Sequence, residues 1–279
     1  MPRPPDGLGQ HLHAAAAALW QNLEPLLPGL NVEVVARADS TNTHLLERAR
    51  RTGDVQPCLL VAEHQTAGRG RLGRDWFASA GASLTFSLAL PMAPREWSGL
   101  SLAVGLALAD ALEPPTAAPP RIVLKWPNDL WLRDAPGAGR KLGGILIETV
   151  SVGGQRLCVV GVGLNVMPQP DHGPSAASAC LQEVMSDISA PAALARVAEP
   201  LVRGLLRFQQ HGFAPLLAGY ARRDLLLNQP VSTTAPGLPL GVADGVDAHG
   251  GLRLRAGAAV HTVVSGEVTV RLLPQGAEA

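Results

Sequence analysis

The stretch "CLLVAEHQTAGRGRLGRDW" (residues 58–76) joins an apolar run to a loop in which arginine and glycine alternate. Its first part, residues 58–64, is typical of a buried strand. Residues 68–74 then hold three arginines and three glycines. Glycine lets a backbone approach a ligand closely, and the planar guanidinium group suits phosphate or carboxylate. Because ligand loops commonly follow strand ends, we expect an anion-binding loop here rather than a solvated turn.

The loop differs from the common nucleotide-binding motifs. The sequence contains no GxxxxGK[ST] pattern and no GxGxxG that opens a helix. Lysine plus arginine and aspartate plus glutamate each number 23, so the formal net charge is zero. Proteins that bind bulk DNA or RNA usually carry a basic excess. We therefore expect no nucleic-acid partner.

Predicted helices and strands alternate on both sides of this stretch. The predicted helices are residues 10–27, 39–53, 97–113 and most of 189–227. The predicted strands are residues 31–38, 58–64, 83–91, 121–126, 129–132, 141–150 and 156–166, the last ending in a glycine-rich turn. Residues 171–187 look irregular. Hairpin-length connections such as "RDAPGAGR" favour an α+β fold with a mixed, largely antiparallel sheet over a doubly wound fold.

The residue pattern changes after "NQP" at 228–230: short apolar runs are now separated by glycine and aspartate. This pattern is typical of a small β-barrel. We expect a catalytic domain over residues 1–228, with a flexible tail at 1–8, and a β-barrel domain over 229–279.

The cysteines and the apolar segments indicate the compartment. Cys58, Cys158 and Cys180 are far apart and form no CxxC pair, which fits a reducing compartment and excludes a disulfide framework. The chain has no convincing signal peptide and no apolar run of membrane-spanning length. We expect a cytoplasmic protein without a membrane partner.

Three further polar segments could carry chemistry. "DSTN" (39–42) is typical of a helix cap, whose free amides also offer donors to a polar ligand. In "KWPNDLWL" (125–132), Asn128 and Asp129 suit either a turn or a Mg²⁺ site that also uses phosphates. In "GRKLGGILIE" (139–148), Lys141 opens a strand, so its ammonium is expected at the end of the sheet beside "KWPND". Taken alone, a solvated lysine is the simpler interpretation.

Together, the four segments supply about five cations, a carboxylate beside an amide, and glycines for close approach. This set suits a polyanionic nucleotide and a second anionic substrate. When a carboxylate attacks a phosphate, the two anions repel each other, and cations relieve that repulsion by positioning and electrostatics. The residues predict anion chemistry without naming the substrate.

The four segments, followed by "GVGLNV" (161–166), resemble the biotin–protein ligases that biotinylate acetyl-CoA carboxylase, in order and approximate spacing. The resemblance covers residues 39–166, and more weakly 241–271, which look like the family's SH3-like barrel. It implies a catalytic domain similar to class II aminoacyl-tRNA synthetases. It also implies that biotin reacts with ATP and Mg²⁺ to form biotinyl-5′-AMP and pyrophosphate, and that a lysine of a biotin carboxyl carrier protein then receives biotin.

The resemblance also implies roles for individual residues. Those implied at biotin are Ser40, Thr41, Asn42, Gln65, Arg69, Gly70, Arg71 and Lys141. Those implied at ATP or the adenylate are Arg69, Arg71, Arg74, Trp76, Lys125, Asn128, Lys141 and Asn165. Catalytic roles fall to Lys141, Arg71 and Asp129, and Asp129 is also the implied Mg²⁺ ligand.

Two other functions remain to be weighed. One is a lipoate or octanoate ligase of related fold, and the other is a non-catalytic, biotin-responsive regulator. Some members of the family carry an N-terminal helix-turn-helix domain, but only about thirty residues precede the first predicted strand here, too few for that module. We therefore expect a ligase without DNA binding. The resemblance leaves a homodimer open.

Overall fold

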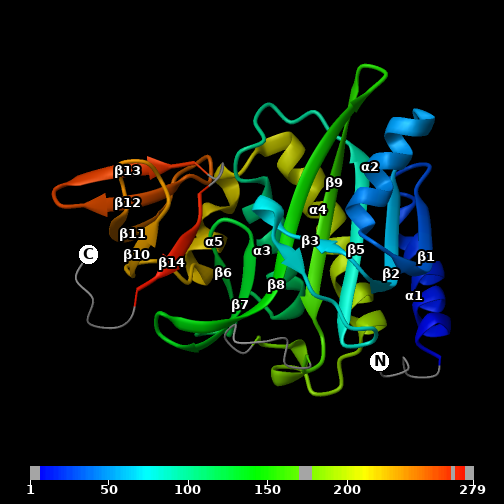
Figure 1. The fold of residues 1–279 in the computed structure, drawn as a ribbon, viewed down its shortest axis with the longest axis horizontal. Helices are drawn as coiled ribbons and strands as arrows, with labels where there is room; N and C mark the ends of the chain where they lie inside the picture. Colours follow the sequence, from blue (N-terminus) through cyan, green and yellow to red (C-terminus); the bar gives the residue numbers. More distant parts are fainter. Residues whose placement is uncertain (1–6, 170–177, 265–267, 274–279) are drawn as a thin grey trace. The chain divides into compact units, whose positions relative to one another are not determined.

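The computed structural model of this chain describes residues 7–169, 178–264 and 268–273. The chain divides into two compact units. The first comprises Met1–Ala93 and Leu142–Arg203, and the second comprises Pro94–Lys141 and Gly204–Ala279. Figure 1 labels their helices and strands.

The first unit is built on an antiparallel sheet with one parallel pair. Its strands are β1 (Asn31–Ala38), β2 (Cys58–Gln65), β5 (Ser83–Pro91), β9 (Gln155–Asn165) and the larger part of β8 (Ala138–Val152). β1 and β2 are parallel, whereas β2 pairs with β5, β5 with β9 and β9 with β8 in antiparallel register. A hairpin joins β8 to β9 through Gly153 and Gly154, whose positive φ angles of 54° and 80° favour glycine.

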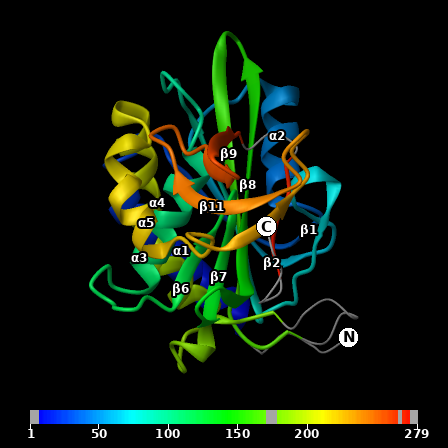
Figure 2. The same cartoon turned by 90° about the vertical axis from the view of Figure 1, so that its left-hand side faces the viewer.

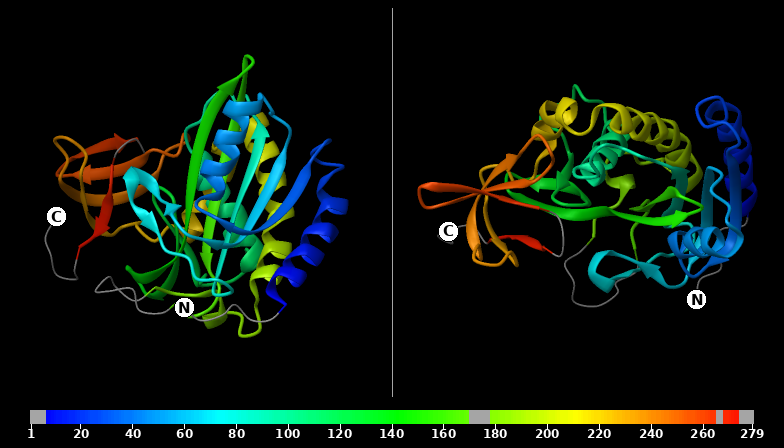
Figure 3. Two further views of the ribbon diagram at one scale, coloured as in Figure 1. Left: turned by 45° about the vertical axis from the view of Figure 1, so that its right-hand side comes forward. Right: turned by 90° about the horizontal axis from the view of Figure 1, so that it is seen from above.

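Helices cover both faces of this sheet. α2 (Thr41–Thr52) packs on β2, β5 and β9, while α4 (Ala190–His211) lies on the opposite face (Figure 3). α1 (Leu8–Leu23) packs beside β1, and η2 (Leu181–Glu183) is a short 3₁₀ turn. The predicted tail at residues 1–8 lies outside the described residues up to residue 6, and Leu8 already belongs to α1.

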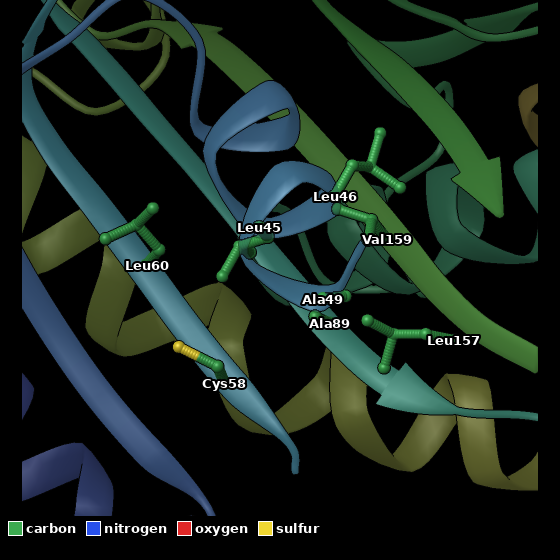
Figure 4. Packing of buried hydrophobic residues seen from close by; sticks show 8 residues of the cluster. All are labelled: Leu45, Leu46, Ala49, Cys58, Leu60, Ala89, Leu157 and Val159. Atoms are coloured by element: carbon green, nitrogen blue, oxygen red, sulfur yellow. The ribbon is translucent and has the colours of Figure 1, made fainter. Parts of the chain in front are cut away.

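The sequence of α2 explains where the helix begins and ends. The Ser40 side chain accepts a hydrogen bond from the backbone N–H of Thr43, and Gly53 ends the helix with a φ of 75°. Its apolar side packs into a buried cluster (Figure 4). The cluster residues are Leu45, Leu46, Ala49, Cys58, Leu60, Ala89, Leu157 and Val159. This packing fixes the N-terminus of α2 against the sheet.

The second unit contains α3 (Leu100–Leu112), the hairpin of β6 (Ile122–Lys125) and β7 (Asp129–Ala135), η3 (Ala214–Leu216) and α5 (Leu217–Arg223). The first four residues of β8 also belong to the second unit. β8 therefore begins in the second unit and ends in the first. The complete strand order is β1-β2-β5-β9-β8-β7-β6.

The second unit also holds a separate five-stranded antiparallel sheet, drawn orange to red in Figure 2. Its strands are β10 (Pro230–Thr233), β11 (Leu240–Val246), β12 (Leu252–Ala256), β13 (Ala259–Val263) and β14 (Val270–Leu272), in the order β13-β12-β11-β10-β14. The predicted fold class, α+β with a largely antiparallel sheet and a small C-terminal β-structure, is confirmed. The domain boundary at residue 228 stays a prediction.

One strand prediction was wrong in detail. The strand predicted over 156–166 is confirmed as β9, but its end is not a glycine-rich turn, because Gly161 and Gly163 pair with Ser87 and Thr85 of β5. Larger neighbouring side chains occupy the space that a side chain at either position would need. Of the described helices, none has the length and apolarity needed to span a membrane.

Candidate functional site

A group of buried polar side chains lies where α2 begins and β2 ends. Ser40, Thr41, Asn42 and Gln65 are each less than 10% exposed. The Gln65 side-chain oxygen accepts hydrogen bonds from the Thr41 backbone N–H at 3.0 Å and from its hydroxyl at 3.2 Å. The "DSTN" segment and the end of β2, which precedes the arginine- and glycine-rich loop, are therefore brought together. Their preorganised polar atoms suit recognition of a small polar ring.

Asn42 is held by hydrogen bonds to two strands of the first unit, β5 and β8. Its oxygen accepts from the Ser87 hydroxyl at 2.6 Å, and its nitrogen donates to the Leu146 carbonyl at 3.1 Å and to Glu148 Oε2 at 3.0 Å. Gly161 provides the space, because a side chain there would overlap the Asn42 amide. These contacts use the whole amide to anchor the start of α2, and the direct biotin contact implied for Asn42 stays a prediction.

The alternating arginines and glycines form a short hairpin, cyan in Figure 3. β3 (Gly68–Arg69) pairs with β4 (Asp75–Trp76), and the Gly70 N–H donates to the Arg74 carbonyl at 2.7 Å. The 3₁₀ turn η1 (Arg71–Gly73) lies between them, with Leu72 at a φ of 58° and half exposed. The hairpin thus places Arg71 in the turn and an exposed Arg74 just after it.

Arg69 ties the base of this hairpin to its surroundings. One guanidinium nitrogen donates to the Thr43 hydroxyl at 3.3 Å, and the other lies 3.2 Å from Glu148 Oε1. Trp76 packs against Gly163 of β9, where a side chain would overlap the indole ring. The hairpin is therefore attached at both ends, through Arg69 and through Trp76.

Asn165 is the last residue of β9 and is buried. Its side-chain nitrogen donates to the Ala179 carbonyl at 3.0 Å. This bond fixes the residues that precede η2. The nucleotide contact implied for Asn165 stays a prediction.

In the second unit, an ion pair joins the other two predicted segments. The Lys141 ammonium lies 2.7 Å from Asp129 Oδ1. Lys141 is 42% exposed and Asp129 is 19% exposed, so the ammonium stays accessible while the carboxylate is mostly covered. The expectation that Lys141 projects beside the "KWPND" segment is confirmed, but Lys141 does not open the strand, because β8 begins at Ala138.

The "KWPND" segment itself forms a turn. Lys125 pairs with Asp129 across the β6–β7 hairpin, which leaves Trp126, Pro127 and Asn128 as the connection. Asn128 is half-buried in this turn. The turn interpretation of the segment is therefore correct, and it does not exclude ligand binding by the side chains.

Lys125 and Trp126 bind the C-terminal β-structure. Lys125 Nζ donates to the Val270 carbonyl at 2.9 Å and lies 4.8 Å from the centre of the Trp131 ring. The buried Trp126 indole donates to the Gly250 carbonyl at 3.0 Å. These anchoring contacts could not be foreseen from the sequence, and the adenylate contact implied for Lys125 stays a prediction.

The cysteines do not offer a nucleophile. All three are buried, and burial raises the pKa of the Cys58 and Cys158 thiols to about 12. A thiol with such a pKa stays protonated at neutral pH and reacts poorly.

Comparison with known proteins identifies the family. Residues 34–165 match the model of the biotin/lipoate A/B protein ligase family. The biotin–[acetyl-CoA-carboxylase] ligase of Mycobacterium tuberculosis is 38% identical over 246 residues, which cover 85% of this chain and 88% of the relative. This chain belongs to the biotin/lipoate protein ligase family. The bifunctional ligase/repressor BirA of Escherichia coli is 34% identical over 88% of this chain and 75% of its own length.

Solved structures of the family share this fold. The biotin protein ligase of Aquifex aeolicus in complex with biotin and ATP matches with a TM-score of 0.72 and 28% identity. The match covers 87% of this chain and 99% of that protein. The similarity thus extends beyond the residues covered by the family model.

Proposed function

We propose that this chain is an ATP-dependent biotin–protein ligase. Biotin's carboxylate attacks the α-phosphate of ATP, which gives biotinyl-5′-AMP and pyrophosphate. A lysine of a biotin carboxyl carrier protein, such as that of acetyl-CoA carboxylase, then attacks the mixed anhydride and releases AMP. The observation that carries the proposal is the match over 99% of the length of a ligase whose structure contains both biotin and ATP.

The polar group at the start of α2 supports a role in binding biotin. Thr41 and Gln65 are already hydrogen-bonded to each other, so their side chains need little reordering when a ligand arrives. Ser40 caps the same helix end by accepting from the Thr43 N–H, which fixes the first turn of α2 beside Gln65. A ureido group carries both donors and acceptors, which matches this mixture.

The cations address the repulsion between biotin's carboxylate and ATP. We assign Lys141 to neutralise both anions, and Arg71 to the turn that covers the adenylate. Among the described residues no group of three potential metal ligands occurs. Asp129 alone is the residue that would hold Mg²⁺, which commonly takes one carboxylate together with substrate phosphates. Bound Mg²⁺ would withdraw charge from the phosphates.

The family description also includes lipoate, so substrate choice is the first property to test. The protein is mixed with ATP, Mg²⁺, an apo carrier domain and either biotin, lipoate or octanoate. We expect the carrier mass to increase by one biotinyl group only with biotin, and not when the acceptor lysine is replaced by arginine. Pyrophosphate exchange that depends on lipoate and ignores biotin would overturn the proposal, and so would biotin binding without any exchange.

A further inference from the structure

Glu148 lies at the meeting point of the two ligand-binding segments of the first unit. It is on β8 and its side chain is 24% exposed. One carboxylate oxygen accepts from Asn42 at 3.0 Å, and the other lies 3.2 Å from Arg69. A single carboxylate therefore binds the start of α2 and the base of the Gly-Arg hairpin.

The two contacts differ in their setting. Asn42 is buried, seated over Gly161 and bonded to Ser87, so its end of the network is fixed. Arg69 is 50% exposed, so its ion pair with Glu148 can open without unfolding the sheet. The same arginine also reaches Thr43, one residue beyond Asn42. The hairpin base is thus held by contacts of modest strength to a rigid support.

We propose that Glu148 is a positioning residue that holds the Gly-Arg hairpin at the N-terminus of α2. It does not touch the reacting atoms. Its charge sets how often the base of the hairpin is released from α2, and hence how well the hairpin retains biotin and its adenylate. The kinetic part rests on the proposed function, whereas the position of the hairpin in the free protein does not.

Limited digestion with trypsin tests the position of the hairpin without any ligand. Cleavage after Arg71 and Arg74 is followed by mass spectrometry. Glu148→Gln keeps an acceptor for Asn42 but removes the charge opposite Arg69, and we expect cleavage about two- to fivefold faster, the range for an exposed ion pair. Glu33→Gln is the matched control, because it breaks the 2.6 Å ion pair with Arg48 elsewhere in the same unit. It should leave cleavage at these sites unchanged.

A double-mutant comparison assigns the effect to the ion pair. Arg69→Met should speed cleavage by a similar factor, and adding Glu148→Gln should then have no further effect. Independent, multiplying effects would contradict the proposal, as would wild-type cleavage of Glu148→Gln.

Kinetics then connect position to the reaction. In biotin-dependent pyrophosphate exchange, Glu148→Gln should raise the KM for biotin about two- to fivefold and leave kcat within about twofold of the wild type. A two- to fivefold fall in kcat with an unchanged KM for biotin would overturn the positioning role. Should the wild type show no biotin-dependent exchange, the proposed function fails while the digestion result still stands.

Discussion

At the scale of single residues, the Asp129–Lys141 pair combines an accessible ammonium with a mostly covered carboxylate. The ammonium is 2.7 Å from the carboxylate and 42% exposed. Under the proposed function, a substrate phosphate would pair with the Lys141 ammonium, and Asp129 would then be available to hold Mg²⁺. Exchange of one charged partner for another avoids leaving a mostly covered carboxylate alone.

Lys141→Ala should lower the rate of adenylate formation by about 10²-fold or more, because one preorganised electrostatic contact to the developing charge is removed. Biotin binding should remain measurable by calorimetry, since the polar group at the start of α2 is untouched. Arg140→Ala is the control. This neighbouring cation pairs with Asp134 at 2.8 Å instead. Near-normal pyrophosphate exchange in Lys141→Ala would refute the assignment.

Gly163 is a second single-residue test, because it makes room for Trp76. A methyl group there would overlap the indole ring. We expect Gly163→Ala to lower the free energy of unfolding by about 1–3 kcal/mol, the usual cost of overpacking, and to speed trypsin cleavage of the hairpin. Urea denaturation and digestion measure the two effects. Combining it with Trp76→Leu should restore stability, and a double variant as unstable as Gly163→Ala would contradict this explanation.

At the scale of elements, a buried arginine joins α5, α3 and β6. Arg223 is 2% exposed and donates to Asp110, to the Glu113 carboxylate and carbonyl, and to the Ile122 carbonyl, at 2.7 to 2.8 Å. Glu113 also accepts from the backbone N–H groups of residues 121 and 122. The proline-rich connection 114–120 is therefore closed at both ends by one network.

Arg223→Met should destabilise the protein by about 3–5 kcal/mol, because removing one partner of a buried network leaves carboxylates without their counter-charge. Chemical denaturation at neutral pH measures the loss. Arg203→Met is the control, since its ion pair with Glu199 is 61% and 38% exposed. Such exposed pairs contribute about 0–1 kcal/mol. Similar losses in both variants would rule out a special role for Arg223.

The elements also show which features local sequence can predict. Caps and apolar periodicity placed α2 and the strands, because those signals lie within a few residues of the structure they set. Partners far apart in sequence could not be foreseen. Asn42 and Glu148 are separated by 106 residues, and Arg223 and Asp110 by 113. Gly161 and Gly163 were predicted to form a turn, but glycine is needed there because Asn42 and Trp76, from other elements, occupy the space of a side chain.

The candidate site was predictable for a different reason. The anion chemistry came from the cations, the carboxylate–amide pair and the glycines of four segments, and it stays a prediction. The Asp129–Lys141 ion pair confirms one expected juxtaposition. The anchoring of Lys125 to Val270 was not foreseeable, because nothing near residue 125 specifies a contact with β14.

At the scale of the whole molecule, one buried acid couples stability to pH. Asp224 is 6% exposed, and Oδ1 accepts from the Leu226 N–H at 2.9 Å. Oδ2 is buried without a hydrogen-bond partner among the described residues. Burial raises the pKa of this carboxyl to about 6, although backbone hydrogen bonds and Arg133 oppose the shift. The folded state therefore favours the protonated acid.

The sign of the pH dependence follows from this shift. As pH rises from about 4 to 6, the unfolded state ionises first, so the free energy of unfolding falls. Above pH 7 the accumulated loss of unfolding free energy is about 3 kcal/mol, because the pKa of Asp224 is raised from 3.8 to about 6 on folding. Asp224→Asn keeps the Oδ1 acceptor and cannot ionise. Relative to the wild type, it should gain stability as pH rises from 4 to 7 and then stay level.

Urea denaturation of both proteins between pH 4 and 8 measures this difference, which cancels the contributions of all other acids. The exposed Asp187→Asn serves as the matched control for losing a carboxylate at the surface. A constant stability difference across the range would contradict the assignment. A difference that grows between about pH 4 and pH 7 and stays level above pH 7 would identify Asp224 as the titrating group.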